Sequence, residues 1–176
     1  LRFFEANGLA YTGHPERNVA VPTAVGTLKT TYRVPRTMWQ AVAALERRAP
    51  CLLVDIQGLK GFSARQIAET LKPVWPGLQT ARVVFPDTHA AGEVFAERLA
   101  RSLELDKNRG KFADALLPHV KGVDTLGLPA ILGISKPVRV MQDIERRLGV
   151  AVFEIPTMPP GATGLRLKET FESGLA

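Results

Sequence analysis

The chain has 176 residues, of which 45% are hydrophobic and 23% are charged, and its mean hydropathy is +0.02. These values are typical of one globular domain, and no apolar run reaches the roughly 18 residues that a transmembrane helix needs. The net charge is +6, but the basic residues are scattered among acids with little aromatic interleaving, so no nucleic-acid partner is predicted.

The first residue is Leu1, the chain opens in the middle of a pattern, and the acid at Glu5 within a short apolar patch does not fit a signal peptide. We therefore expect residues 1–176 to be a single domain from inside a longer protein, with proteolytic maturation as the alternative. The one cysteine, Cys51, begins an apolar run and is predicted to be a small buried side chain. A chain without a disulfide is typical of a reducing, cytoplasmic compartment.

Residues 8–34 are predicted to form β structure. Short β-branched or aromatic stretches at residues 9–12, 18–21 and 27–32 are separated by glycine and proline. This pattern is typical of a hairpin or of a small antiparallel piece.

From about residue 36, predicted helices alternate with predicted strands. The apolar run 51–56 indicates a strand buried on both faces, and Ser63 with Gln66 forms a capping box for the next helix. Strands are further predicted at 81–85, 124–132 and 151–155, and helices over 39–48, from Asp87 or Thr88, from Asn108, from Ser135 and after residue 161. The alternation predicts an α/β fold: a mainly parallel sheet of about four strands with helices on both faces, Rossmann-like, plus the N-terminal antiparallel piece.

Neither phosphate-binding glycine motif, G-x-G-x-x-G or G-x-x-x-x-G-K-[ST], occurs in the sequence. In parallel sheets, ligands usually bind at the loops that follow the carboxyl ends of the strands. Each polar residue there could equally be a helix cap or a turn residue, and Asp87 in particular suits an N-cap. The histidines have no metal-ligand spacing, so no metal is predicted. The polar residues at this edge are Asp55, Gln57, Lys60, Asp87, His89 and Thr157.

Three prolines between residues 156 and 160 stiffen the connection from the last strand to the last helix. Gly164 and Arg166 follow at the start of that helix, where backbone N–H groups and a guanidinium could bind an anion. A loop with a purely structural role is the alternative.

The segment Ile155-Pro156-Thr157-Met158-Pro159-Pro160, followed by Gly164, Arg166 and Leu167, resembles an "IPT-x-PP-x-x-x-G-x-R-L" pattern. This pattern belongs to the B subunit of anaerobic glycerol-3-phosphate dehydrogenase, an FAD-dependent oxidoreductase family. Residues 26–31, 54–62 and 126–133 are similar to other stretches of the family in the same order. The resemblance covers the chain from about residue 25 to residue 173.

The resemblance implies that this chain is an inserted capping or substrate domain, inactive when isolated, between two parts of a dinucleotide-binding half. The full-length protein would hold FAD or FMN, with none expected in this fragment, and would oxidise glycerol 3-phosphate to dihydroxyacetone phosphate and pass electrons to quinone. Its partners would be the FAD domain of the same chain, the A and C subunits and an anionic small-molecule substrate.

The expected location is cytoplasmic or peripheral on the inner face of the cytoplasmic membrane. A non-catalytic module that docks subunits is one alternative, and a free nucleotide-binding protein, which the absent glycine motif disfavours, is another. The candidate substrate-facing or flavin-facing residues are Lys29, Lys60, Thr157, Gly164 and Arg166.

Overall fold

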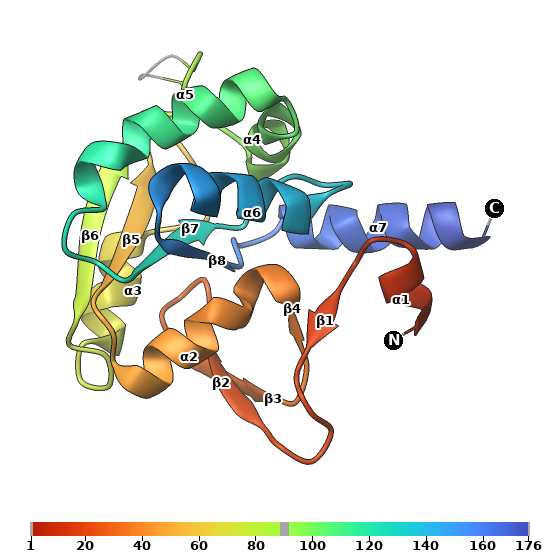
Figure 1. Ribbon diagram of the computed structural model, residues 1–176, viewed down its shortest axis with the longest axis horizontal. Coiled ribbons are helices and arrows are strands. Elements are labelled where there is room, and N and C mark those ends of the chain that lie inside the picture. Colours follow the sequence, from red (N-terminus) through yellow and green to blue (C-terminus); the bar gives the residue numbers. More distant parts are fainter. Residues whose placement is uncertain (1, 89–91, 176) are drawn as a thin grey trace.

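A computed structural model describes residues 2–88 and 92–175 (Figure 1). Its centre is a four-stranded sheet in the order β6-β5-β7-β8, with every neighbouring pair parallel. The strands are β5 (Cys51–Ile56), β6 (Leu78–Val83), β7 (Thr125–Pro129) and β8 (Ala151–Ile155). The predicted α/β fold with a parallel sheet is therefore confirmed.

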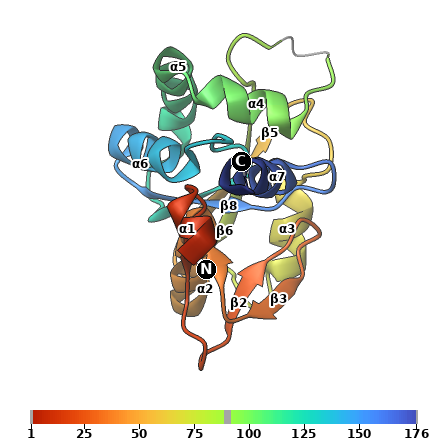
Figure 2. The same cartoon turned by 90° about the vertical axis from the view of Figure 1, so that its right-hand side faces the viewer.

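Helices cover both faces of this sheet (Figures 1 and 2). Side chains of β5 alternate between two cores, as the pleat of a strand requires. Leu53 packs with residues of α2 and α3, whereas Leu52 and Val54 pack with residues of α4, α5 and α6. These helices are α2 (Trp39–Arg47), α3 (Ala64–Leu71), α4 (Ala96–Leu103), α5 (Asp106–Leu116) and α6 (Pro137–Leu148), with a 3-10 turn η2 (Leu117–His119) after α5.

The predicted N-terminal antiparallel piece is present as two short pairs of strands. Strand β1 (Tyr11–Thr12) pairs with β4 (Val34–Pro35), and β2 (Val19–Pro22) pairs with β3 (Leu28–Thr31). The 3-10 turn η1 (Arg36–Met38) leads from them into α2. Val19, Val34 and Met38 pack on Val42 of α2, so this piece joins the body of the domain.

The two ends of the chain lie side by side at one pole (Figures 1 and 2). Helix α1 (Arg2–Ala6) contacts α7 (Ala162–Leu175), which extends away from the sheet (Figure 1). The rings of Phe3 and Phe171 are 5.6 Å apart. No helix within residues 2–88 and 92–175 is long and apolar enough to cross a membrane.

The sheet's edge strand differs from its prediction. The predicted strand 81–85 lies at 78–83 in the structure. Among the described residues, strand β6 pairs with β5 alone, and it exposes Gln79, Thr80 and Arg82. The polar residues at the start of β6 do not give a strand pattern, because an edge strand need not be apolar, and the predicted strand therefore began three residues too late.

Three predicted helix starts are wrong. Asp87 lies in a turn with a left-handed φ of 60°, and the helix after it begins at Ala96. The reason is that the N–H of Val94 donates to the carbonyl of Gly58 (3.0 Å), which holds this segment against the loop after β5. Asn108 lies inside α5 instead of capping it. The N-cap of α6 is Lys136, one residue after Ser135. His89, a predicted residue of the carboxyl edge, lies outside the described residues.

Of the predicted capping box, the N-cap is confirmed: the hydroxyl of Ser63 accepts the N–H of Gln66 (3.2 Å) and so caps α3. The predicted burial of Cys51 is confirmed as well. Cys51 is fully buried, and this burial raises the pKa of its thiol to about 12. A thiol in this state is inert, as expected for a cysteine that serves only in packing.

Candidate functional site

Two loops at the carboxyl edge of the sheet touch each other. They follow β5 and β8 and span residues 57–63 and 156–161. The N–H of Met158 donates to the carbonyl of Gly61 (2.8 Å), and Gly61 has a left-handed φ of 74°. A Cβ added at Gly61 would lie 2.9 Å from the Cβ of Met158, so the glycine permits this close approach. The contact brings Lys60 and Thr157, two predicted site residues, onto neighbouring loops.

Lys60 and Thr157 offer different chemistry at this edge. Lys60 is exposed, and its Nζ lies 3.3 Å from Oε1 of Glu93. A surface pair of this kind is weak, so an anion can replace the carboxylate. The Oγ1 of Thr157 is buried and has no hydrogen-bond partner within the described residues. A buried hydroxyl without a partner is costly, which makes Thr157 a candidate for a contact with a ligand or with further chain.

Arg166 lies in a buried ion pair. Its guanidinium donates to both carboxylate oxygens of Glu154, over 2.6 and 2.8 Å, and its Nε donates to the carbonyl of Gly133 (2.8 Å). Oε1 of Glu154 also accepts the N–H of Leu132 (2.6 Å). The exposed fractions of the two side chains are 3% for Arg166 and 0% for Glu154. Arg166 therefore ties α7 to β8 and to the loop after β7, and its charge is already balanced.

Carboxylates also occupy the backbone positions at which related sheets bind phosphate. Oδ1 of Asp55 accepts the N–H of Ala64 at the start of α3 (2.7 Å). Oε1 of Glu104 accepts the N–H groups of Ile134 and Ser135 just before α6, over 3.0 and 2.6 Å. A dinucleotide diphosphate needs such N–H groups free and tolerates no carboxylate beside them. These two turns therefore do not fit a dinucleotide diphosphate.

The two remaining predicted residues lie in separate surroundings. Lys29 is exposed on β3, which belongs to a different sheet. The hairpin of β3 approaches α3, because a Cβ added at Gly26 would lie 2.9 Å from the Cβ of Thr70. Gly164 is exposed in α7, and its N–H already donates to the carbonyl of Gly161 (3.2 Å).

Replacing Gly164 with alanine is expected to raise the free energy of unfolding by about 0.5–1 kcal/mol. An added Cβ would meet nothing within 4 Å, and Gly164 is not in the left-handed region, so the substitution adds helix propensity without a clash. Urea unfolding followed by circular dichroism measures the change. The matched control is Gly149→Ala at the end of α6, where φ is 71° and alanine should destabilise. A destabilised Gly164→Ala variant would contradict the prediction.

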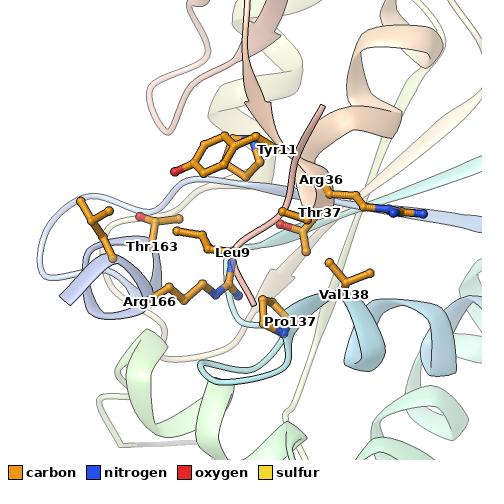
Figure 3. Close-up of a pocket in the computed structure, with 11 residues that line it drawn as sticks. Leu9, Tyr11, Arg36, Thr37, Pro137, Val138, Thr163 and Arg166 are labelled. Carbon is orange, nitrogen blue, oxygen red and sulfur yellow. The ribbon is translucent and has the colours of Figure 1, made fainter. Parts of the chain in front are cut away.

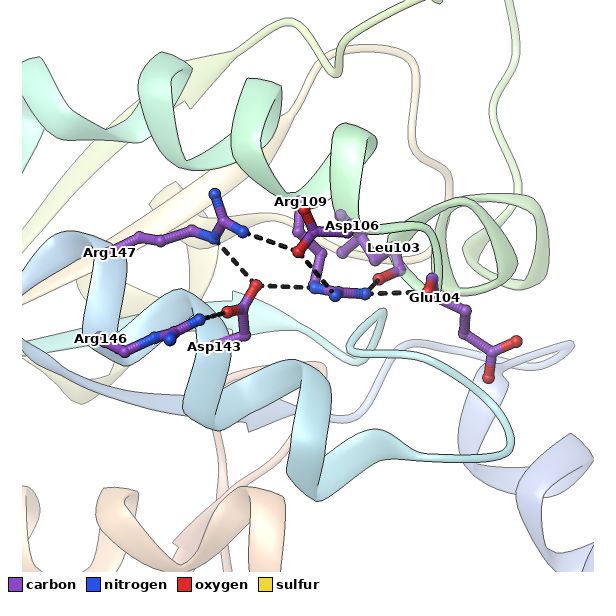
Figure 4. A network of polar contacts seen from close by, with 7 residues as sticks. All are labelled: Leu103, Glu104, Asp106, Arg109, Asp143, Arg146 and Arg147. Atoms are coloured by element: carbon purple, nitrogen blue, oxygen red, sulfur yellow. Dashed lines mark hydrogen bonds and ion pairs between the residues drawn. The ribbon is translucent and has the colours of Figure 1, made fainter.

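Glu154 was not among the residues predicted from the sequence. A charged residue inside the apolar stretch 152–155 is the available signal, because a buried charge needs a partner. A second charge cluster, between α5 and α6, in which Arg109 meets Asp143, was not predicted either (Figure 4). The described residues contain no group of three potential metal ligands, so neither cluster suggests a metal site.

The family model described as an FAD binding domain matches residues 1–176, and the chain belongs to this family. Its relatives include a protein of Halobacterium salinarum named as the probable B subunit of anaerobic glycerol-3-phosphate dehydrogenase. That protein is 31% identical over 96% of this chain and 42% of its own length. The resemblance found in the sequence is therefore confirmed.

Other relatives are named as the B subunit of the same enzyme. The relative from Aliivibrio fischeri is 28% identical over 85% of this chain and 35% of its own length. That from Pectobacterium atrosepticum is 29% identical over 67% of this chain and 29% of its own length. The chain thus spans about two-fifths or less of these curated relatives. No solved structure matches it.

Proposed function

We propose that residues 1–176 form the capping or substrate domain of a flavin-dependent glycerol-3-phosphate dehydrogenase, inserted into its FAD-binding half. The continuous match of the whole chain to the FAD binding domain family carries this proposal, together with the relatives named as the B subunit of that enzyme. The position of both ends at one pole supports an insertion, because inserted domains commonly have neighbouring ends.

In the full-length protein, glycerol 3-phosphate would be oxidised to dihydroxyacetone phosphate, with electrons passed toward quinone. The flavin, FAD or FMN, supplies the redox chemistry. The carboxylates of Asp55 and Glu104 on the backbone N–H groups support the view that residues outside this domain bind the flavin diphosphate. The full-length protein would assemble with the A and C subunits at the inner face of the cytoplasmic membrane.

Of the five candidate residues, Lys60 and Thr157 fit contact with an anionic substrate best. Lys60 is an exposed cation with a weakly held partner, and Thr157 has a hydroxyl without one among the described residues. Arg166 would act indirectly, because its bonds to Glu154 and Gly133 fix the backbone that leads to the Thr157 loop. Lys29 and Gly164 lack a contact within the described residues that would place them beside Lys60.

The test uses the full-length gene product. Bound flavin is measured by its visible absorption, and activity by dye-linked oxidation of glycerol 3-phosphate. We expect both in the wild-type protein. A flavin-free, inactive protein would refute the enzymatic proposal.

Lys60→Ala is expected to lower kcat/KM for glycerol 3-phosphate at least about ten-fold, mainly through KM, because a charge-assisted bond contributes about 1.5–3 kcal/mol. Lys121→Ala is the control, since Lys121 is an exposed lysine just before β7, at the opposite edge of the sheet. Equal kinetics for Lys60→Ala and the wild type would remove Lys60 from the site.

A second candidate function is a non-catalytic module that docks subunits. The internal pairing of Arg166 with Glu154 favours it, because the strongest anion-binding candidate is no longer available. Co-purification of the A and C subunits with a full-length protein that binds no substrate would support this alternative.

A further inference from the structure

An apolar surface covers the pole at which the two chain ends meet. We call it the α1–α7 face, and it consists of Phe3, Phe4, Tyr11, Leu167, Phe171 and Leu175. Its aromatic rings form a continuous chain of contacts: the ring centroids of Tyr11 and Phe4 are 5.9 Å apart, and those of Phe4 and Phe171 are 5.6 Å apart. The exposed fractions of Leu167, Phe171 and Leu175 are 39%, 42% and 79%. A contiguous exposed apolar patch of this kind is typical of a binding surface.

The periodicity of α7 shows that this surface lies beside the buried stripe of the helix and is separate from it. The buried residues of α7 are Ala162, Arg166 and Thr170, spaced four apart. Leu167, Phe171 and Leu175 have the same spacing but start one residue later, which rotates them by about 100° around the helix. One apolar stripe of a helix normally packs on a partner. Here the second stripe of α7 is covered only in part: Phe171 packs on Phe3 and Phe4 of α1, yet it stays 42% exposed, and Leu175 stays 79% exposed.

A small cavity of about 80 Å³ opens beside this stripe (Figure 3). Leu9, Tyr11, Pro137 and Leu167 provide apolar walls, and Thr37 also lines it. Thr37 is 3% exposed, and its Oγ1 has no hydrogen-bond partner within the described residues. A group that entered the cavity could satisfy this hydroxyl and bury the surrounding apolar surface.

We propose that the α1–α7 face is the docking surface for the polypeptide that flanks residues 1–176 in the full-length protein. The inference rests on the proposed insertion into an FAD-binding half. The relative from Halobacterium salinarum has more than half of its length outside the matched region. The face is carried by α1 and α7, the first and last helices of the chain, so flanking segments would leave the domain beside it.

Thiol labelling of the full-length protein tests this docking. Leu175→Cys, Leu167→Cys and the control Leu117→Cys each introduce one thiol, and mass spectrometry follows the labelling of that peptide. Leu117 is 50% exposed in η2, at the far end of α5 from the face. The native Cys51 is buried and reacts slowly.

We expect the thiols of Leu175→Cys and Leu167→Cys to react at least ten-fold more slowly than that of Leu117→Cys, at every protein concentration. In urea the three rates should become equal. Equally fast labelling in the native protein would overturn the proposal. Protection that disappears on dilution would overturn it too, because the occupant would then be a second copy of the chain. Flavin content and activity are measured separately, so a protein without flavin can still show the protection.

Discussion

Arg166→Ala is expected to lower the free energy of unfolding of the domain by about 3–5 kcal/mol. The substitution leaves the carboxylate of Glu154, which is 0% exposed, without its bidentate partner. It also removes the bond from Nε to the carbonyl of Gly133. Urea unfolding monitored by tryptophan fluorescence gives the change, because Trp75 is fully buried in the core.

Two further variants separate the buried charge from a general effect on α7. Lys168→Ala removes an exposed cation that lies 3.7 Å from Glu172, and we expect it to unfold like the wild type. The double variant Arg166→Met with Glu154→Leu should recover most of the loss, since apolar residues can replace a buried ion pair. If Arg166→Ala were as stable as the wild type and only raised KM for substrate, Arg166 would instead contact the ligand.

The predictable parts of the fold are the strands whose residue pattern is set by burial alone. Strands β5 and β8 lie at residues 51–56 and 151–155, as predicted, because a strand covered on both faces must be apolar throughout. Strand β6 is more exposed to solvent, and polar residues such as Thr80 and Arg82 are common in loops as well as in strands. Its true start at Leu78 depends on pairing with β5, which no local pattern reveals.

For the candidate site, the sequence predicted where the residues lie but not what they contact. The sequence correctly places Lys60 and Thr157 on loops at the carboxyl edge of the sheet, since topology alone fixes that edge. The role of Arg166 depends on the carbonyl of Gly133, 33 residues away, and on the direction in which α7 leaves the sheet. Asp87 likewise does not cap a helix, because the N–H of Val94 donates to the carbonyl of Gly58, a residue 36 positions earlier in the chain.

Asp143 is the centre of the second buried charge cluster (Figure 4). Burial tends to raise the pKa of its carboxyl, but hydrogen bonds from Arg109, Arg147 and Arg146 outweigh burial and hold the pKa well below its usual value. Nε of Arg109 and Nε of Arg147 lie 2.8 and 2.9 Å from Oδ2 of Asp143. The side chains of Arg109 and Asp143 are 9% and 10% exposed, so the pair joins α5 to α6 with little of either side chain in contact with solvent.

Asp143→Asn is therefore expected to lower the free energy of unfolding by about 3 kcal/mol at pH 7, because Arg109 keeps its charge without its buried partner. The sign of the pH dependence follows from the lowered pKa. The carboxylate stabilises the folded state fully above the unfolded pKa of about 3.9, and this stabilisation is lost as the pH falls below that value.

The difference in unfolding free energy between wild type and Asp143→Asn should thus be constant from pH 7 to about pH 5 and should shrink below about pH 4. Urea unfolding at a series of pH values measures it. Asp87→Asn is the control, because Asp87 pairs with Lys111 on the surface, where water screens the pair and little stability is at stake. Parallel pH curves for wild type and Asp143→Asn down to pH 3 would show that the arginines do not hold the carboxylate in its charged form, and the joint between α5 and α6 would then rest on apolar packing alone.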